Sequence, residues 1–179
     1  PVELALDAGR LGVERFAIRG ANTELSVTGS VGAAGELDVE AVGSLDLRLL
    51  TGVLPALRRP HGRLTLEAHV GGTAELPVML GDGRIEEGGF VLRGGQAAFE
   101  QLRGDLAFSQ NKVLFDALDC QVNGGRVRMG GEVELDRLVP ARLRVEAQLD
   151  EVPVAVPAYL PATLTGRLEA AGTPDETLV

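Results

Sequence analysis

Apolar and polar residues alternate along most of this chain. Between residues 63 and 70, leucine, alanine or valine fills every second position, and arginine, threonine, glutamate and histidine fill the others. Successive side chains of a β-strand point to opposite faces, so this stretch predicts a strand with one apolar and one charged face. The same alternation recurs over residues 24–28, 36–41, 126–135 and 142–149.

Turn-forming residues separate these stretches. Asn123-Gly124-Gly125 is a strong hairpin signal, because Asn-Gly supplies the positive φ angles that a type I′ turn needs. The segments 109–112 and 32–35 separate further pairs of apolar runs. Turns that recur about every 8–12 residues are typical of an antiparallel meander, and we expect roughly a dozen strands. The predicted fold class is therefore all-β, with strands that follow one another across one elongated sheet.

One segment departs from the alternation. From Ser44 to Leu57 the leucines fall at positions 47, 50, 54 and 57, which is the spacing of one face of a helix. Ser44 or Asp46 is a suitable N-cap, and prolines at 55 and 60 crowd the end. We expect a short helix of about two to three turns, which ends near residue 53 or 55 and lies over one end of the sheet.

The chain also resembles itself at an offset of about 100 residues. Residues 10–31 match residues 112–133 with side chains of like character at most positions. Both copies share an irregularity, because Val13 and Phe16 are out of step by one residue and so are Phe115 and Leu118. One extra residue in a strand predicts a β-bulge at each place.

This self-similarity predicts the organisation of the chain. We expect an imperfect repeat, with the end of one copy at 1–61, a full copy at 62–161 and the start of the next at 162–179. The opening Pro1-Val2-Glu3 does not resemble a natural start. We therefore expect the sequence to be a fragment of a longer, repetitive protein.

Composition and charge exclude several classes of function. The formal net charge of −9 argues against nucleic-acid binding, which needs clustered Lys and Arg. The short basic run Arg58-Arg59, followed by Pro60 and His61, is expected to be a solvated loop. Aromatic residues make up only 3% of the chain, with no Trp, whereas a closed β-sandwich usually fills part of its core with them. No stretch approaches the length of a transmembrane helix.

The sequence offers no catalytic or metal-binding set. Its two histidines, His61 and His69, and its one cysteine, Cys120, lack the spacing of a zinc site. Cys120 lies in an apolar run and is expected to be a small buried hydrophobe. The carboxylates alternate with apolar residues, as on a solvated face, and no phosphate loop or nucleophile elbow occurs. We expect no enzymatic activity, no cofactor and no metal.

Several segments together resemble a known family. Residues 72–77, which read Gly-Thr-Ala-Glu-Leu-Pro, and residues 76–85 after them look like the entry into a repeat of the AsmA/TamB family. Residues 102–108, 113–115 and 123–133 follow the typical order of that family, and Leu160-Pro161 with Gly172-Thr173-Pro174 is similar to its next entry. The resemblance covers nearly the whole chain and consists mostly of glycines and alternation.

The resemblance implies a fold and a function. Members of that family form a U-shaped, taco-like antiparallel sheet with an apolar interior, are anchored in the inner membrane of diderm bacteria and cross the periplasm. They are implicated in moving phospholipid to the outer membrane. By this resemblance we expect a segment of a periplasmic lipid conduit that shields phospholipid acyl chains. We expect its inner-membrane anchor and an outer-membrane barrel partner to lie outside this sequence.

The expected groove is lined by the apolar members of the alternating strands. These residues are Leu25, Val27, Leu37, Val39, Leu64, Leu66, Val70, Leu106, Phe108, Phe115, Val127, Met129, Val133, Leu143, Val145, Leu164 and Leu168. An aliphatic lining suits acyl chains, which gain about 0.8 kcal/mol for each buried CH₂ and need no oriented partner. Two alternatives stay open: a scaffold for outer-membrane protein assembly, and a β-sandwich or solenoid binding module without a lipid role.

Overall fold

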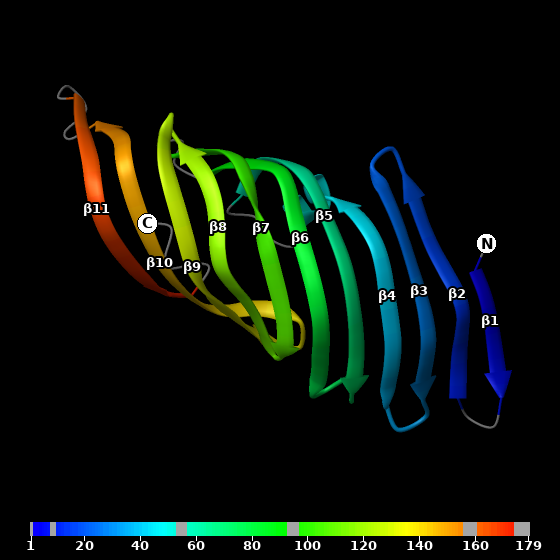
Figure 1. Cartoon of the computed structure of the whole chain (residues 1–179). Coiled ribbons are helices and arrows are strands. Elements are labelled where there is room, and N and C mark those ends of the chain that lie inside the picture. The colour runs from blue at the N-terminus through cyan, green and yellow to red at the C-terminus, as the bar shows by residue number, and fades with distance from the viewer. Residues whose placement is uncertain (1, 8–9, 53–56, 93–96, 156–160, 174–179) are drawn as a thin grey trace.

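The described part of the chain forms one antiparallel sheet. The structure is a computed structural model that describes residues 2–7, 10–52, 57–92, 97–155 and 161–173. Its eleven strands lie in the order of the sequence, β1 to β11, so each strand pairs with its neighbours along the chain (Figure 1). The strands are β1 (Val2–Asp7), β2 (Arg10–Gly20), β3 (Thr23–Gly32), β4 (Leu37–Asp46), β5 (Leu57–Gly72), β6 (Pro77–Leu92), β7 (Ala98–Gln110), β8 (Lys112–Val122), β9 (Gly125–Asp136), β10 (Val139–Ala155) and β11 (Pro161–Gly172). The predicted all-β meander is confirmed.

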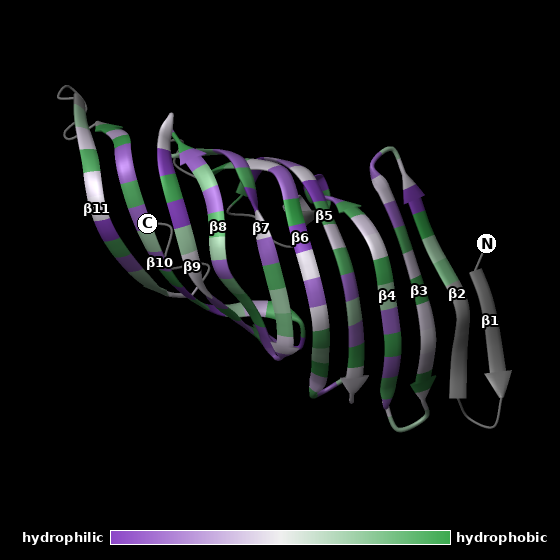
Figure 2. Ribbon diagram, in the orientation of Figure 1, coloured by the Kyte–Doolittle hydropathy of each residue, from purple (hydrophilic) through white to green (hydrophobic). Residues whose placement is uncertain are grey.

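The register of the strands places the apolar residues in rows across the sheet. One row runs from Val27 through Ala41, Ala68 and Gly81 to Phe108, one residue on each of β3 to β7. The neighbouring positions on each strand are polar for the most part, so green and purple bands alternate along the ribbons (Figure 2). The period-2 pattern of the sequence therefore becomes a sheet with an apolar and a polar face.

Both bulges that the sequence predicts are present. The pairing of β2 with β3 shifts between Val13 and Phe16, and the pairing of β8 with β9 shifts between Phe115 and Leu118. Without these shifts, the residues beyond each irregularity would turn to the opposite face. The bulges therefore keep the apolar residues of both strand pairs on one side. The repeat of about 100 residues stays a prediction.

The Asn-Gly turn also forms as predicted. Val122 pairs with Gly125, and the two residues between them, Asn123 and Gly124, have φ angles of 51° and 92°. The Asn123 side chain also links the turn to a third strand, because its Oδ1 accepts a hydrogen bond from the Ala98 amide of β7 at 3.1 Å. Its Nδ2 donates to the Pro153 carbonyl at 3.3 Å. One turn thus connects the ends of β7 and β10.

The predicted helix is present over its described part, as a 3₁₀ helix, and it begins after Asp46, one of the two expected caps. Strand β4 continues through Ser44, so Ser44 is not the cap, and a six-residue 3₁₀ helix, η1 (Leu47–Gly52), follows it. Asp46 is the cap instead, since its Oδ1 accepts a hydrogen bond from the Arg48 amide at 2.9 Å. Residues 53–56, where the helix was expected to end, lie outside the described residues. Leu57, the last leucine of the helical spacing, is already in β5.

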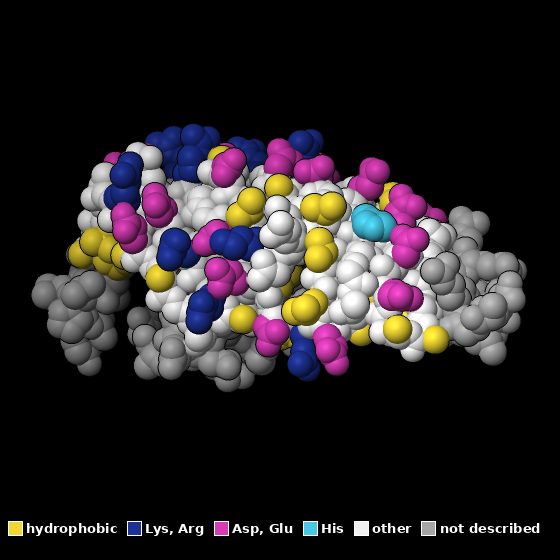
Figure 3. Space-filling view, turned by 90° about the horizontal axis from the view of Figure 1, so that it is seen from below, with side chains coloured by type: hydrophobic (Ala, Val, Ile, Leu, Met, Phe, Trp, Pro, Cys, Tyr) yellow, Lys and Arg dark blue, Asp and Glu magenta, His cyan; other side chains and the backbone are white. Residues whose placement is uncertain are grey.

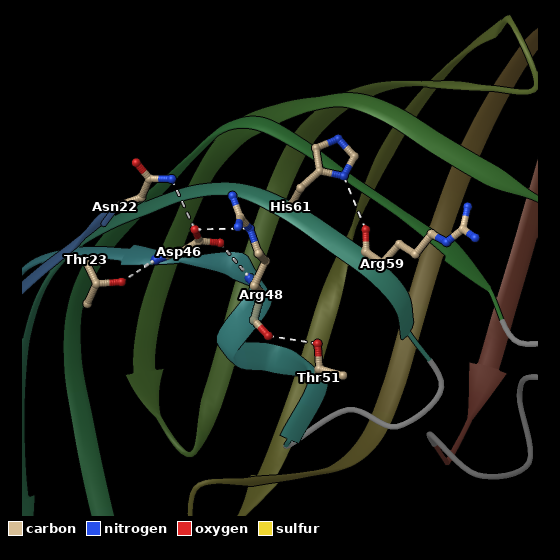
Figure 4. A network of polar contacts seen from close by, with 7 residues as sticks. All are labelled: Asn22, Thr23, Asp46, Arg48, Thr51, Arg59 and His61. Atoms are coloured by element: carbon tan, nitrogen blue, oxygen red, sulfur yellow. Dashed lines mark hydrogen bonds and ion pairs between the residues drawn. The ribbon is translucent and has the colours of Figure 1, made fainter. Parts of the chain in front are cut away.

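A polar network fixes the start of η1 to the β2–β3 turn (Figure 4). The Asn22 side chain donates to Asp46 Oδ2 at 3.3 Å, and the Asp46 amide donates to Thr23 Oγ1 at 3.0 Å. The hydrogen bond from the Arg48 amide, the largest cause, lowers the pKa of Asp46. Leu47 beside it is only 6% exposed, and η1 contacts β5, so the helix is packed against the sheet.

The basic run at Arg58-Arg59 is part of a strand, which corrects the expectation of a loop. Strand β5 includes Arg58, Arg59, Pro60 and His61, with register shifts against β6 on both sides of His61. Arg59 has a φ of 52°. Proline is tolerated in a strand where a bulge interrupts the ladder, because its missing N–H then costs no hydrogen bond.

Glycines on the apolar face let neighbouring strands approach closely. Gly43 and Gly81 have φ angles of 145° and 144°, a region that is almost restricted to glycine. A Cβ at Gly43 would lie 2.0 Å from the Glu24 carbonyl oxygen, and one at Gly81 would lie 2.1 Å from that of Glu67. Both glycines lie in apolar rows, where they remove side chains from the face.

We predict that Gly81→Ala destabilises the protein by about 2 kcal/mol or more, from the φ strain and the backbone clash together. The control is Gly52→Ala, because Gly52 has no heavy atom within 4 Å of an added Cβ and lacks a positive φ. That change should leave stability within about 0.5 kcal/mol of the parent. Urea unfolding followed by circular dichroism measures both. Equal stability of the two variants would contradict the requirement for glycine.

Candidate functional site

All seventeen residues expected to line the groove lie on one face of the sheet. The pairings connect them step by step. Leu25 and Leu66 both face Gly43, and Val133 pairs with Val113 on one side and with Leu143 on the other. On β11, Leu168 pairs with Ala147, and Leu164 pairs with Val152. We call this surface, from β2 to β11, the apolar face.

Burial varies along the apolar face. Phe115 and Val127 are buried, with 8% and 5% exposure, whereas Leu164 and Leu168 are 48% and 55% exposed. The two leucines lie on β11, which has only one neighbouring strand in the described part of the chain. The other thirteen predicted residues are half-buried. At the opposite end, Phe16 and Ile18 of β2 are each 37% exposed.

The best-covered part of this face is a cluster over β7 to β10. Its buried members are Leu102, Phe115, Leu118, Cys120, Val122, Val127, Ala147 and Val152. Phe90 and Phe99 pack against it as a stacked pair, with ring centroids 4.5 Å apart. Six of these eight residues were not among the predicted lining. The alternation could have identified Ala147, and the predicted bulge at residues 115–118 could have identified Leu118, whereas the bulge at residues 149–152 shifts the phase at Val152.

No second layer covers the apolar face within the described residues. The substantial contacts between elements are those of consecutive strands and of η1 with β5. Ten spacings of about 4.8 Å give such a sheet a length of about 48 Å. The half-buried leucines and valines thus shield one another along and across the strands, while part of each stays open.

The opposite face carries the charged residues, and we call it the charged face. Over β6 to β10, opposite charges meet across neighbouring strands. Arg84 Nε lies 2.6 Å from Asp105 Oδ1, and Lys112 Nζ lies 2.9 Å from Glu132 Oε2. The hydrogen bond from Arg84 lowers the pKa of Asp105. Such exposed pairs contribute little stability one at a time, but each favours one register over its alternatives.

One hollow of the charged face is mixed in charge. It has a volume of about 890 Å³ and lies over β5 to β8, beside the start of η1. Arg48, Arg63, Arg84 and Arg103 line it together with carboxylates, and two of these arginines form ion pairs there, with Asp46 and with Asp105. His61 and the backbone of the glycines at 62 and 104 complete its wall. Four arginines and five carboxylates line it, so it is not a cluster of one sign of charge.

The residues that could take part in catalysis or bind a metal do not lie together. His69 lies on the charged face with its Nε2 3.8 Å from Asp38 Oδ1, while His61 borders the hollow described above. Among the described residues, no group of three or more His, Cys, Asp or Glu has the geometry to hold a metal ion, and no buried side-chain N or O lacks a hydrogen-bond partner. None of the described helices is long and apolar enough to cross a membrane.

Searches for relatives do not assign this chain to a family. No family model, curated protein or solved structure matches this chain.

Cys120 is a buried apolar residue of this face, as its sequence context predicts. It is 6% exposed and pairs with Val127 across β8 and β9. Burial raises the pKa of its thiol to about 11, and the neighbouring Asp119 carboxylate adds to the shift. Its thiolate fraction at pH 8 is therefore about one in a thousand.

We predict that Cys120 reacts with an aromatic disulfide reagent at pH 8 at least a hundredfold more slowly in the folded protein than in 6 M guanidinium chloride. Burial and the raised pKa act in the same direction, because only the thiolate attacks the reagent. Absorbance of the released thiol measures both rates. Equal rates would show that β8 and β9 open to solvent far more often than the packing of Cys120 implies.

Proposed function

We propose that this chain is a segment of a lipid conduit, in which the apolar face forms the inside of a U-shaped groove that holds phospholipid acyl chains. One observation carries the proposal: a single open sheet presents apolar side chains on one face from β2 to β11, and no second layer of the described chain covers them. A contiguous apolar surface of that extent rarely stays in water unless it binds something.

The chemistry of the lining favours acyl chains over other apolar ligands. The seventeen residues are leucines, valines, two phenylalanines and one methionine, so the face offers area for burial and almost no oriented polar group. Sites for specific small molecules place a few hydrogen-bonding groups among the apolar ones. An acyl chain needs none of these, and each CH₂ that it buries contributes about 0.8 kcal/mol.

The glycines and bulges support the curled shape. Gly43 and Gly81 remove side chains from the apolar face and adopt φ angles that bend their strands. Glycine kinks and bulges are devices that curve a sheet. The low exposure of Val152 and Leu118 supports an apolar inner side over β8 to β10, and the side chains of Arg84 and Asp105 on the charged face are more than 60% exposed.

The order of glycines and alternating strands that resembles the AsmA/TamB family supports the cellular part of the proposal. In this proposal, the segment lies in the periplasm of a diderm bacterium. It connects an inner-membrane anchor with the outer membrane through further segments of the same kind. A continuous apolar groove moves lipid by diffusion along its length, and the proposal includes no catalytic step.

We predict that a photo-crosslinking amino acid at Leu66 or Val145 captures phospholipid in cells, because both positions are on the apolar face. The matched controls are Glu67 and Glu146, the next residues on the same strands, which are exposed on the charged face. Mass spectrometry of the purified adducts identifies the captured lipid. Capture from all four positions, or from none, would argue against an apolar lipid groove.

We also predict that Leu66→Arg abolishes lipid that co-purifies with the chain, while Glu67→Arg retains it. A guanidinium on the apolar face places a charge in the path of the acyl chains, where burial without a partner is costly. Circular dichroism and unfolding curves must show that both variants fold. If Leu66→Arg unfolds the protein, Val145→Glu tests the same face on β10. A folded Val145→Glu variant with unchanged lipid content would contradict the proposal.

A further inference from the structure

Three turns lie together where strands β5 to β10 end, and they line a second cavity. These are the β5–β6, β7–β8 and β9–β10 connections, at residues 73–76, 110–111 and 137–138. The cavity has a volume of about 340 Å³, and its apolar wall consists of Leu76, Pro77, Val78, Leu135 and Leu138. We call this surface the turn-edge pocket. It is separate from the hollow on the charged face.

Large apolar side chains are unusually exposed at the turn-edge pocket. Leu76 is 77% exposed, the highest value among the exposed large hydrophobics of the described chain, and Leu138 is 42% exposed. Leu80 on β6 extends the apolar surface from Val78, with exposed fractions of 51% and 39%. In Figure 3, which views the molecule from below the sheet of Figure 1, hydrophobic side chains lie at the surface among acidic and basic ones.

Leu138 has an unfavourable backbone conformation for a leucine. Asp136 pairs with Val139, so Arg137 and Leu138 form a two-residue turn with φ angles of 50° and 68°. Turns with two positive φ angles favour Asn and Gly, as at Asn123-Gly124 of this chain. A leucine in the left-handed region is unfavourable, and strained residues cluster at sites of function.

The charges around the pocket indicate what kind of partner fits. Glu75 and Asp136 line it against one basic residue, Arg137, and within the described chain none of the three forms an ion pair. Glu67 and Asp82, on the charged face near Leu80, lie opposite each other on β5 and β6, and within the described chain neither forms an ion pair. A partner that brings an apolar side chain next to Lys or Arg complements both features.

We propose that the turn-edge pocket is a docking site for a segment of a partner protein that inserts one apolar side chain and flanks it with Lys or Arg. The volume of about 340 Å³ is larger than one side chain, so it accommodates an apolar anchor residue together with the aliphatic stems of its Lys or Arg neighbours. Acidic neighbours make an anionic membrane surface a poor occupant, because lipid phosphates would meet Glu75 and Asp136. The pocket thus adds a protein contact to a sheet whose apolar face serves another ligand.

The test uses NMR spectra of the isotope-labelled chain with three blocked tripeptides: Lys-Leu-Lys, Glu-Leu-Glu and Lys-Ser-Lys. Lys-Leu-Lys should shift the amide signals of residues 73–78, 110–111 and 135–138, with weak, saturable binding. The other two should shift them at least tenfold less at the same concentration. Glu75→Gln combined with Asp136→Asn should weaken Lys-Leu-Lys binding, and Glu100→Gln with Glu146→Gln should not, although net charge changes equally.

Leu138→Gly separates a functional role from a structural one. Glycine relieves the positive φ, so the midpoint of thermal unfolding should rise by a few degrees, while loss of the side chain should weaken Lys-Leu-Lys binding at least tenfold. Leu49→Ala, at a 56% exposed leucine of η1, should retain binding. Three results would overturn the proposal: unchanged binding by Leu138→Gly, shifts of these amides with protein concentration alone, or shifts with zwitterionic lipid vesicles and not with Lys-Leu-Lys.

Discussion

The structure depends on one constraint: a single sheet with an apolar face has no second layer of its own to cover that face. In a sandwich, the second sheet buries the leucines and valines of the first. Here the substantial contacts of the described strands are with their neighbours along the chain, apart from those of η1 with β5. Within the described residues, the apolar side chains are therefore covered mainly by one another, and the proposed function supplies a ligand for the area that stays exposed. The fold and the proposed function both follow from how that constraint is met.

Glycines and bulges affect how well the apolar face is covered, because they change the backbone and the side chains that stand on that face. A row such as Leu66, Gly83 and Leu106 alternates large and absent side chains across three strands, which leaves room for the sheet to bend toward its apolar side. Leu118, Val127 and Val152 are below 10% exposure although no second layer of the described chain covers them. At β2 and β11 the coverage decreases, and Phe16, Ile18, Leu164 and Leu168 stay open. Coverage of the apolar face is thus greatest over β7 to β10 and lowest on the strands at the two ends of the described sheet.

The sequence predicted the sheet better than it predicted its details. Alternation has a period of two, so it assigns residues to faces once the strands are known, and all seventeen predicted lining residues do share a face. Even two bulges were visible, because each one shifts the phase of the apolar residues at Val13–Phe16 and Phe115–Leu118. The helical spacing of the leucines included Leu57, which belongs to β5, while the expected end of the helix lies outside the described residues. The turn-edge pocket was missed entirely, since it is formed by three turns that only the register brings together.

The charged face explains why such a sheet keeps one register. A slip of one residue would move every apolar side chain to the outer face, and flat apolar rows alone discriminate weakly between a correct pairing and one shifted by two residues. The ion pairs supply that discrimination. Asp119 with Arg128, Arg126 with Asp150 and Lys112 with Glu132 join charges that are opposite each other or one diagonal step apart. A two-residue slip would place Arg126 beside Gln148 or Val152 in place of Asp150 and break its pair. The solvent-exposed pairs thus contribute specificity more than stability. Because they define the register, the apolar face needs no polar groups for that purpose.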